Sequence, residues 1–372
     1  MKSFPLKSDR VSLAVTETGG QLSDVQFALA DGRTVAPMHV APWADETFTD
    51  DIPPMLRVLR GDFLAAPFGS SDVIATETRV HGLAANGTWR LTGRSEAALD
   101  AALDGTIMGA TLAKRIELRP GECAVYQRHT FSGGNGRLPV GHHAMLRAET
   151  PLRLGFAPWT LAITPPEPVE TPPGGRPLLA EGQTIRDLTR AKRPDGTTAD
   201  LTVFPTAEGY EALWMLASDP APAFAWTTAT AADQQWVWFS LKNQRTLPET
   251  LLWFSNGGRD YPPWNGRHRR AIGIEEICGY FHLGHAASTG GNPVAASGAA
   301  TALELVPDGN LTISYIFGLA ATPANFGAVT EVTAAPGGIR LMDGAGRVVF
   351  AACDLSFVTG TVGERTPAPR MD

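Results

Sequence analysis

The sequence places two glutamates side by side within an apolar run, AIGIEEICGYFHLG, at residues 271–284. Adjacent carboxylates in a half-buried strand are costly to desolvate unless a partner pairs with them or a reaction uses them. In a strand, Glu275 shares its face mostly with alanine and glycine, whereas Glu276 shares the other face with isoleucine and cysteine. The roomier face favours Glu275 as a catalytic carboxylate. We expect Glu276 to pair with a neighbouring guanidinium, that of Arg269 or Arg270.

Two consecutive histidines stand in the strand-like run VGHHAML, residues 140–146. Alternation puts His142 on an apolar face and His143 on the face of Gly141 and Arg147. An imidazole is charged or neutral near pH 7, so it can serve as an acid or a base. The pattern favours His143 as the ligand-facing residue and leaves His142 as a second candidate for ligand contact. The alternative for either residue is a core histidine with a satisfied hydrogen bond.

Two further segments carry residues suited to a ligand. The loop HGLAANGTW, residues 81–89, starts with His81 and is either a ligand loop or a turn with a core aromatic. Residues 253–270 mix aromatic, amide and guanidinium groups, among them Arg259 and Trp264. A sugar needs such a mixture because its ring is apolar on its faces and polar on its edges. The alternative is a structural turn with Trp264 packed beneath it.

The composition argues against a nucleic-acid-binding protein and against a membrane protein. The chain has 372 residues, 43% hydrophobic and 19% charged, with a net charge of −7. Lys and Arg are scattered, so a nucleic-acid partner is not expected. The basic run at residues 267–270 reads as a solvated loop or as a preference for an anionic substrate. No signal peptide or apolar segment of about 20 residues is present, which predicts a cytoplasmic protein without a membrane partner.

Cofactor motifs are absent from the sequence. It has no Walker loop, no GxGxxG opening a helix, no HExxH, no CxxC and no nucleophile elbow. The three cysteines, at irregular spacing, indicate buried thiols rather than a zinc site. We therefore expect neither a cofactor nor a metal.

The local patterns predict a mainly β protein of one domain over residues 1–372. Short apolar or alternating runs, punctuated by 39 glycines and 29 prolines, predict strands and turns at residues 11–15, 25–29, 34–40, 311–319, 338–342 and 347–353. Asp-Gly pairs predict hairpins at residues 25–40 and 338–353. Residues 95–103 favour a short helix, residues 164–177 a proline-rich loop within the domain, and residues 361–372 a frayed tail.

In order along the chain, these motifs resemble those of the galactose mutarotase-like superfamily, which includes the aldose 1-epimerases. The His81-Gly82 loop, continuing to Asn86 and Trp89, is similar to the family's His-Gly loop. His143 resembles its strand histidine, and Glu275 resembles the glutamate that ends an apolar strand. The likeness runs from about residue 60 to residue 284. It departs from the family after the turn at residues 60–69, where an Asn-Arg pair is replaced by Phe-Gly-Ser.

The resemblance implies one large antiparallel β-supersandwich whose concave face holds a sugar. It implies an enzyme that interconverts sugar anomers without a cofactor, with Glu275 as general base and His143 as general acid. His81 would contact the substrate, and Arg60 would replace the missing arginine. The full set of expected substrate contacts is His81, Arg60, Asn86, His142, Arg259 and Trp264.

Two alternatives stay open because a fold does not determine a reaction. The first is a non-catalytic carbohydrate-binding protein, whose acid–base pair would be too far apart to act on one ring. The second is a carbohydrate lyase or hydrolase-related enzyme, for which Asp62 and Asp260 are the acids to check. The mutarotase reading predicts that His143 and Glu275 reach opposite sides of one pyranose, roughly 5–8 Å apart.

Overall fold

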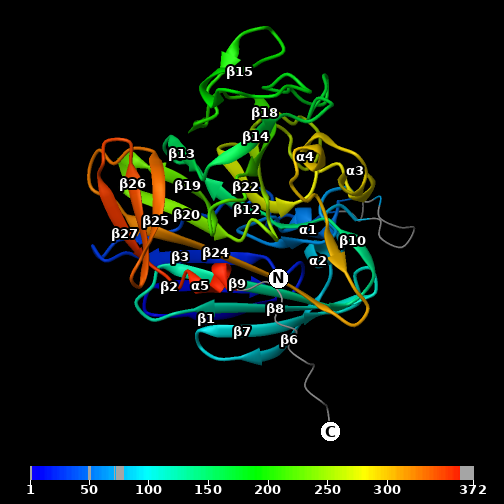
Figure 1. Cartoon of the computed structure of the whole chain (residues 1–372), viewed down its shortest axis with the longest axis vertical. Coiled ribbons are helices and arrows are strands. Elements are labelled where there is room, and N and C mark those ends of the chain that lie inside the picture. The colour runs from blue at the N-terminus through cyan, green and yellow to red at the C-terminus, as the bar shows by residue number, and fades with distance from the viewer. Residues whose placement is uncertain (1, 49–51, 71, 73–78, 361–372) are drawn as a thin grey trace.

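The computed structural model describes residues 2–48, 52–70, 72 and 79–360, so the tail predicted at 361–372 lies outside the described residues. Within these residues, two large antiparallel sheets form the body of the molecule (Figure 1). The front sheet has seven strands: β14 (Trp159–Ile163), β18 (Tyr210–Ser218), β21 (Glu249–Asn256), β22 (Ala271–Cys278), β11 (Val140–His142), β5 (Leu64–Ala65) and β12 (Ala144–Arg147), which pairs with β22.

The back sheet has nine strands in the same part of the chain. In spatial order they are β17 (Val203–Phe204), β13 (Leu152–Phe156), β19 (Ala225–Ala231), β20 (Trp236–Lys242), β24 (Asn310–Ala321), β9 (Ala124–Gly133), β8 (Ala110–Leu118), β7 (Ala98–Leu103) and β6 (Trp89–Arg94).

Smaller elements surround the two sheets. The additional strands are β1 (Ser3–Lys7), β2 (Val11–Thr16), β3 (Leu22–Ala28), β4 (Thr34–Val35), β10 (Gly136–Leu138), β15 (Ala191–Lys192), β16 (Thr198–Ala199), β23 (Leu303–Leu305), β25 (Val329–Ala335), β26 (Gly338–Asp343) and β27 (Val348–Ala352). The helices are α1 (Pro54–Arg57), α2 (Gly82–Asn86), α3 (His285–Thr289), α4 (Pro293–Ala296) and α5 (Ser356–Thr359), with 3₁₀ turns at Leu188–Arg190 and Ala232–Gln234. None of the described helices is long and apolar enough to cross a membrane.

The front and back sheets pack face to face over a continuous apolar core. Ile272 and Ile274 of β22 belong to the same buried cluster as Tyr315 and Phe317 of β24. Alternation along each strand explains this packing, because every second side chain points between the sheets. The other face of the front sheet carries a second buried cluster, which includes Met145 and Ile277. That outer face is where the short helix α1 and several loops gather.

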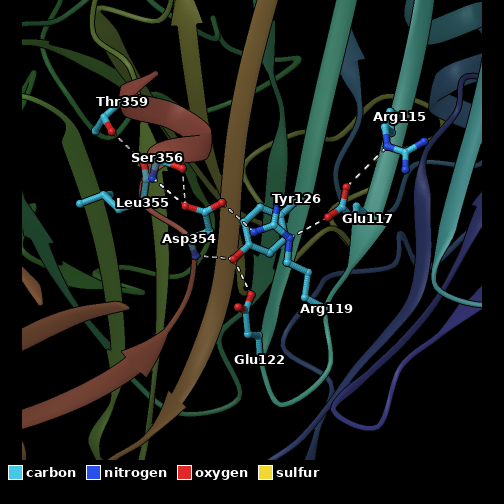
Figure 2. Close-up of polar contacts among 9 residues, drawn as sticks. All are labelled: Arg115, Glu117, Arg119, Glu122, Tyr126, Asp354, Leu355, Ser356 and Thr359. Carbon is cyan, nitrogen blue, oxygen red and sulfur yellow. Dashed lines mark hydrogen bonds and ion pairs between the residues drawn. The ribbon is translucent and has the colours of Figure 1, made fainter. Parts of the chain in front are cut away.

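The outer face of the back sheet is covered by the C-terminal strands β25, β26 and β27, grouped beside β13 and β19, and by α5 (Figure 1). Figure 2 shows how a polar cluster attaches the segment before α5. Asp354 donates its backbone N–H to the Tyr126 hydroxyl at 2.6 Å and accepts a hydrogen bond from Arg119 at 2.8 Å. The Arg119 guanidinium lies over the Tyr126 ring, 4.1 Å from its centroid. Burial, together with the hydrogen bond to Glu122, raises the pKa of Tyr126.

Both predicted hairpins are confirmed: β3 pairs with β4, and β26 pairs with β27. The predicted helix at residues 95–103 is wrong, because β7 occupies this segment and pairs with β6 and β8. Leu99, Ala101 and Leu103 are buried at every second position. The gain from packing these side chains in a sheet exceeds the weak helix preference of an Ala-rich segment.

Candidate active site

A cavity of about 240 Å³ opens on the outer face of the front sheet. Strands β18, β21 and β22 form its floor. Its walls come from α1, from His81 just before α2, from the proline-rich loop and from the loop before β22. The residues that line it are Pro53, Met55, Leu56, Leu59, Ser70, Val80, His81, His143, Val169, Leu213, Leu251, Trp253, Arg259, Trp264, Glu275 and His282.

His143 and Glu275 meet in this cavity. His143 Nε2 lies 3.3 Å from Glu275 Oε1, and both side chains are about 95% buried, at 5% and 4% exposure. The His143 ring stacks on Phe63 with a centroid separation of 4.7 Å. A Cβ at Gly273 would lie 2.8 Å from Glu275 Oε1, so the space that glycine leaves holds the carboxylate itself. The two groups are therefore closer than the roughly 5–8 Å expected for opposite sides of a ring.

Burial sets the electrostatics of this pair. It raises the pKa of Glu275 well above its ordinary value, although the nearby Arg259 opposes that change. It lowers the pKa of His143 to about 4, against a smaller opposing effect of Asp62. Both shifts favour the uncharged forms, a carboxylic acid beside a neutral imidazole. Transfer of the carboxyl proton to His143 gives a carboxylate beside an imidazolium, the form in which Glu275 can accept a proton and His143 can donate one.

His81 stands 5.3 Å from His143, measured between ring centroids. It precedes α2 with a positive φ of 62°, and its Nδ1 accepts the backbone N–H of Gly69 at 3.3 Å. Burial lowers the pKa of His81 well below its ordinary value. With Nδ1 accepting, the neutral ring carries its proton on Nε2. His81 therefore offers a hydrogen-bond donor to a ligand.

Asn86 does not line the cavity. Its Oδ1 accepts the backbone N–H of Met55 at 3.1 Å, and its Nδ2 donates to the carbonyls of Val80 and Gly82 at 2.8 and 2.9 Å. Its amide is occupied in joining α1 to the loop of His81. The expected contact between Asn86 and the substrate is therefore wrong, and the Asn86 side chain instead holds the His81 loop in position.

Arg259 and Trp264, two of the expected substrate contacts, both line the cavity. The Arg259 guanidinium lies over the Trp264 ring at 4.6 Å and over the Trp253 ring at 5.0 Å. Its Nε is 2.5 Å from a carboxylate oxygen of Glu170 and 3.9 Å from one of Glu211. The arginine is held in place by two rings and two carboxylates.

Two further expected substrate contacts also lie outside the cavity. His142 is fully buried between the sheets, where its Nδ1 is 3.1 Å from Asp62 and its ring stacks on Tyr315 at 4.2 Å. Arg60 donates from Nε to the carbonyl of Val58 at 2.9 Å and lines a separate surface hollow with Asp45. Alternation had already placed His142 on the apolar face of its strand. Arg60 was expected to contact the substrate only because of the family resemblance.

Glu276 points between the sheets, as alternation predicted, but its expected partners are wrong. Its Oε2 lies 2.5 Å from Lys242 Nζ, on the facing sheet. Arg269 instead pairs with Glu208, and Arg270 donates to a backbone carbonyl. The basic loop at residues 267–270 therefore does not neutralise the buried carboxylate.

The acids considered for a lyase or hydrolase do not reach the cavity. Asp62 lies behind the front sheet, and Asp260 pairs with Arg176 at the surface. The structure instead adds His282, whose pKa burial lowers to about 4. His282 follows Glu275 within the same apolar segment. The strand β22 ends at Cys278, so alternation could not predict which way the His282 side chain points. Among the described residues, no cluster of three His, Cys, Asp or Glu side chains could hold a metal ion.

Comparison with known proteins gives structural matches only. The sequence matches no family model and no curated protein. The structure resembles a putative aldose 1-epimerase from Escherichia coli K12, with a TM-score of 0.56, 11% identity, and coverage of 86% of this chain and 99% of that one. It also resembles a galactose mutarotase-like protein from Lactobacillus casei, with a TM-score of 0.55, 16% identity, and coverage of 86% and 100%.

A third match is a homologue of aldose epimerase from C. elegans, with a TM-score of 0.56, 10% identity, and coverage of 87% of this chain and 99% of that one. Identities of this size carry the fold and not the reaction. Each match extends over nearly the whole of the neighbouring chain. The protein therefore has the galactose mutarotase-like fold that its sequence motifs indicated.

Proposed function

We propose that this protein interconverts the anomers of a sugar, with Glu275 and His143 as the acid–base pair. The observation that carries the proposal is the 3.3 Å contact between the two side chains inside a buried cavity. In a cyclic sugar, the anomeric hydroxyl and the ring oxygen are bonded to the same carbon. An acid and a base that serve these two oxygens can therefore lie close together, so the observed 3.3 Å contact suits the reaction although the expected separation across the ring was wrong.

The reaction follows from this placement. Glu275 first passes its proton to His143 across their 3.3 Å contact. The resulting carboxylate removes the proton of the anomeric hydroxyl and a C=O bond forms. The bond from the anomeric carbon to the ring oxygen breaks, and the His143 imidazolium protonates that oxygen. Rotation about the first carbon–carbon bond turns the aldehyde, and the reverse proton transfers close the ring to the other anomer. Both residues end in their starting protonation states. Each positioned group typically contributes about 10²–10⁴-fold.

The remaining polar residues support the same chemistry. The Nε2–H of His81 is a suitable donor to a sugar oxygen near the pair, since Gly69 occupies its other nitrogen. The buried setting strengthens such hydrogen bonds because water does not compete with them.

The test is anomer exchange measured by NMR over a panel of neutral aldoses. We expect catalysed exchange with at least one sugar, and a loss of about 10²–10⁴-fold in Glu275→Gln and in His143→Gln. Sugar binding without exchange would contradict the proposal and favour a carbohydrate-binding protein. Catalysis that survives both substitutions would also contradict it.

A further inference from the structure

The lining of the cavity combines two chemically different groups of side chains. His81, His143 and Glu275 form a polar group, in which the His81 and His143 rings are 5.3 Å apart and His143 touches Glu275. Met55 and Leu213 line the cavity as members of the buried apolar cluster on the front sheet.

The aliphatic part of the lining is extensive. Leu59 and Leu251 belong to the same cluster and also face the cavity, while Leu56 and Val169 pack against it. These side chains come from α1 and the residues just after it, from β18 and β21, and from the proline-rich loop, so separate elements supply the aliphatic surface. Aliphatic side chains neither donate nor accept hydrogen bonds. A hydroxyl group held against them loses its water partners without replacement, whereas a C–H group gains from the same burial.

The charges lining the cavity are already compensated. Arg259 is the one Arg or Lys among the described lining residues. Glu170 contacts its Nε at 2.5 Å and Glu211 lies at 3.9 Å, so two carboxylates face one guanidinium. Glu275 adds a further acidic group. Recognition of a phosphate or carboxylate requires cationic donors that are free to pair with it. This site favours a neutral ligand.

Building on the proposed mutarotase function, we propose that the preferred substrate is a neutral deoxy sugar. Its anomeric centre lies at His143 and Glu275, and the carbon that lacks a hydroxyl faces Leu213 and the other aliphatic side chains. The cavity of about 240 Å³ suits such a small ligand, since it falls below the roughly 300–1,000 Å³ usual for larger ones.

The experiment compares sugars that differ in a single hydroxyl. Anomer exchange is measured by NMR for L-fucose against L-galactose, L-rhamnose against L-mannose, and 2-deoxy-D-glucose against D-glucose, with D-glucose 6-phosphate as the anionic sugar. A hydrophobic pocket rejects an added hydroxyl by up to about 100-fold. We expect kcat/KM for at least one deoxy sugar to exceed that of its partner by about 10- to 100-fold. We expect no catalysis with the phosphate.

Failure of this inference is distinct from failure of the mutarotase function. Exchange that is equally fast or faster with every fully hydroxylated partner, or fastest with the phosphate, would overturn the deoxy preference and leave the function standing. Absence of exchange with every sugar would reject the function. Saturation-transfer NMR with the corresponding methyl glycosides, whose rings cannot open, then decides the ligand class by binding alone. Equal binding within each pair, or none, would overturn the inference.

Two substitutions at Leu213 distinguish the effect of a polar side chain on the deoxy preference from the effect of disturbing the cavity. Leu213→Asn places an amide in the aliphatic surface with the same number of side-chain heavy atoms, and we expect it to reduce the deoxy preference about tenfold. Leu213→Met keeps the surface apolar, and we expect it to retain the preference. An unchanged preference in Leu213→Asn, or an equal loss in both variants, would contradict the assignment of this surface.

Discussion

Glu276 and Lys242 form an ion pair between the two sheets, with 2.5 Å between Oε2 and Nζ and both side chains buried. Thr250 also donates to Oε2, at 2.7 Å, while Ser240 and Thr227 donate to Oε1 at 2.7 and 2.8 Å. The carboxylate is thus fully engaged by groups behind the sheet. Its neighbour Glu275 faces the cavity, so adjacent residues on one strand have separate tasks.

This difference predicts opposite behaviour of two single substitutions. Glu276→Gln leaves the Lys242 charge buried without its carboxylate, and removing one partner of a buried pair costs about 3–5 kcal/mol. Glu275→Gln removes a carboxylate whose burial already disfavours its charged form, so we expect little loss of folding free energy. Urea denaturation of both variants measures the two effects. Equal losses would contradict the assignment.

The double variant Lys242→Met with Glu276→Leu provides the control. It replaces both charged groups by apolar ones, which is often close to neutral for a buried pair. We expect it to be more stable than Glu276→Gln. A loss equal to or greater than that of the single variant would show that the surrounding hydroxyl groups, and not the pair, determine the cost.

The sequence predicted side-chain directions correctly where residues alternate between the two faces of a strand. Alternation alone separated Glu275 from Glu276 and His143 from His142, because each strand is buried on both faces and its register is strongly constrained. It did not identify Lys242, which lies on the facing sheet. The position of such a partner depends on how the sheets pack, and no local period records that.

Glu211 positions the aromatic wall of the cavity. Its carboxylate accepts hydrogen bonds from Trp253 Nε1 at 2.8 Å, from Ser255 Oγ at 3.0 Å and from the Gly258 N–H at 3.0 Å. An amide at this position has one acceptor oxygen and an NH₂ group that cannot accept. We expect Glu211→Gln to raise the KM for anomer exchange about tenfold, equivalent to about 1.4 kcal/mol, with a smaller effect on kcat.

Tryptophan fluorescence gives a readout of the Trp253 environment that does not depend on turnover, and it should change in Glu211→Gln. Glu208→Gln is the matched control, because Glu208 is 68% exposed and pairs with Arg269 at the surface. We expect wild-type KM and fluorescence in that variant. The same shift in both variants would refute a specific role for Glu211.

Gly82 sets the position of His81 through its backbone. It has a φ of 65°, and a Cβ there would lie 2.2 Å from the carbonyl oxygen of Ala66. Gly82→Ala therefore adds a backbone clash to the roughly 1–2 kcal/mol cost of a left-handed conformation. We expect a larger loss of stability than in Gly32→Ala, where φ is 86° but no atom lies within 4 Å. Urea denaturation compares them, and equal losses would exclude the clash.

The burial of His39 makes the free energy of unfolding depend on pH in the acid range. Its two ring nitrogens have no hydrogen-bond partner among the described residues, and its ring meets the edge of His268 at 4.7 Å. Burial, aided by Arg147, lowers the pKa of His39 from 6.5 to about 4. Between these pH values the unfolded chain binds more protons than the folded protein. Stability from this residue is therefore complete above pH 6.5 and is lost as the pH falls toward 4.

At about 1.4 kcal/mol per pKa unit, this loss amounts to about 3 kcal/mol. His39→Phe keeps a planar ring of similar size but cannot be protonated. We expect the variant to gain up to that amount relative to wild type between pH 6.5 and pH 4, when urea denaturation is measured at each pH. His143 and His282 titrate in both proteins and cancel in the comparison. His268 differs, because burial lowers its pKa and His39 contributes to that lowering. A pH-independent difference between the two proteins would mean that the pKa of His39 is not lowered in the folded state, because a lowered pKa makes the contribution of His39 to stability depend on pH in this range.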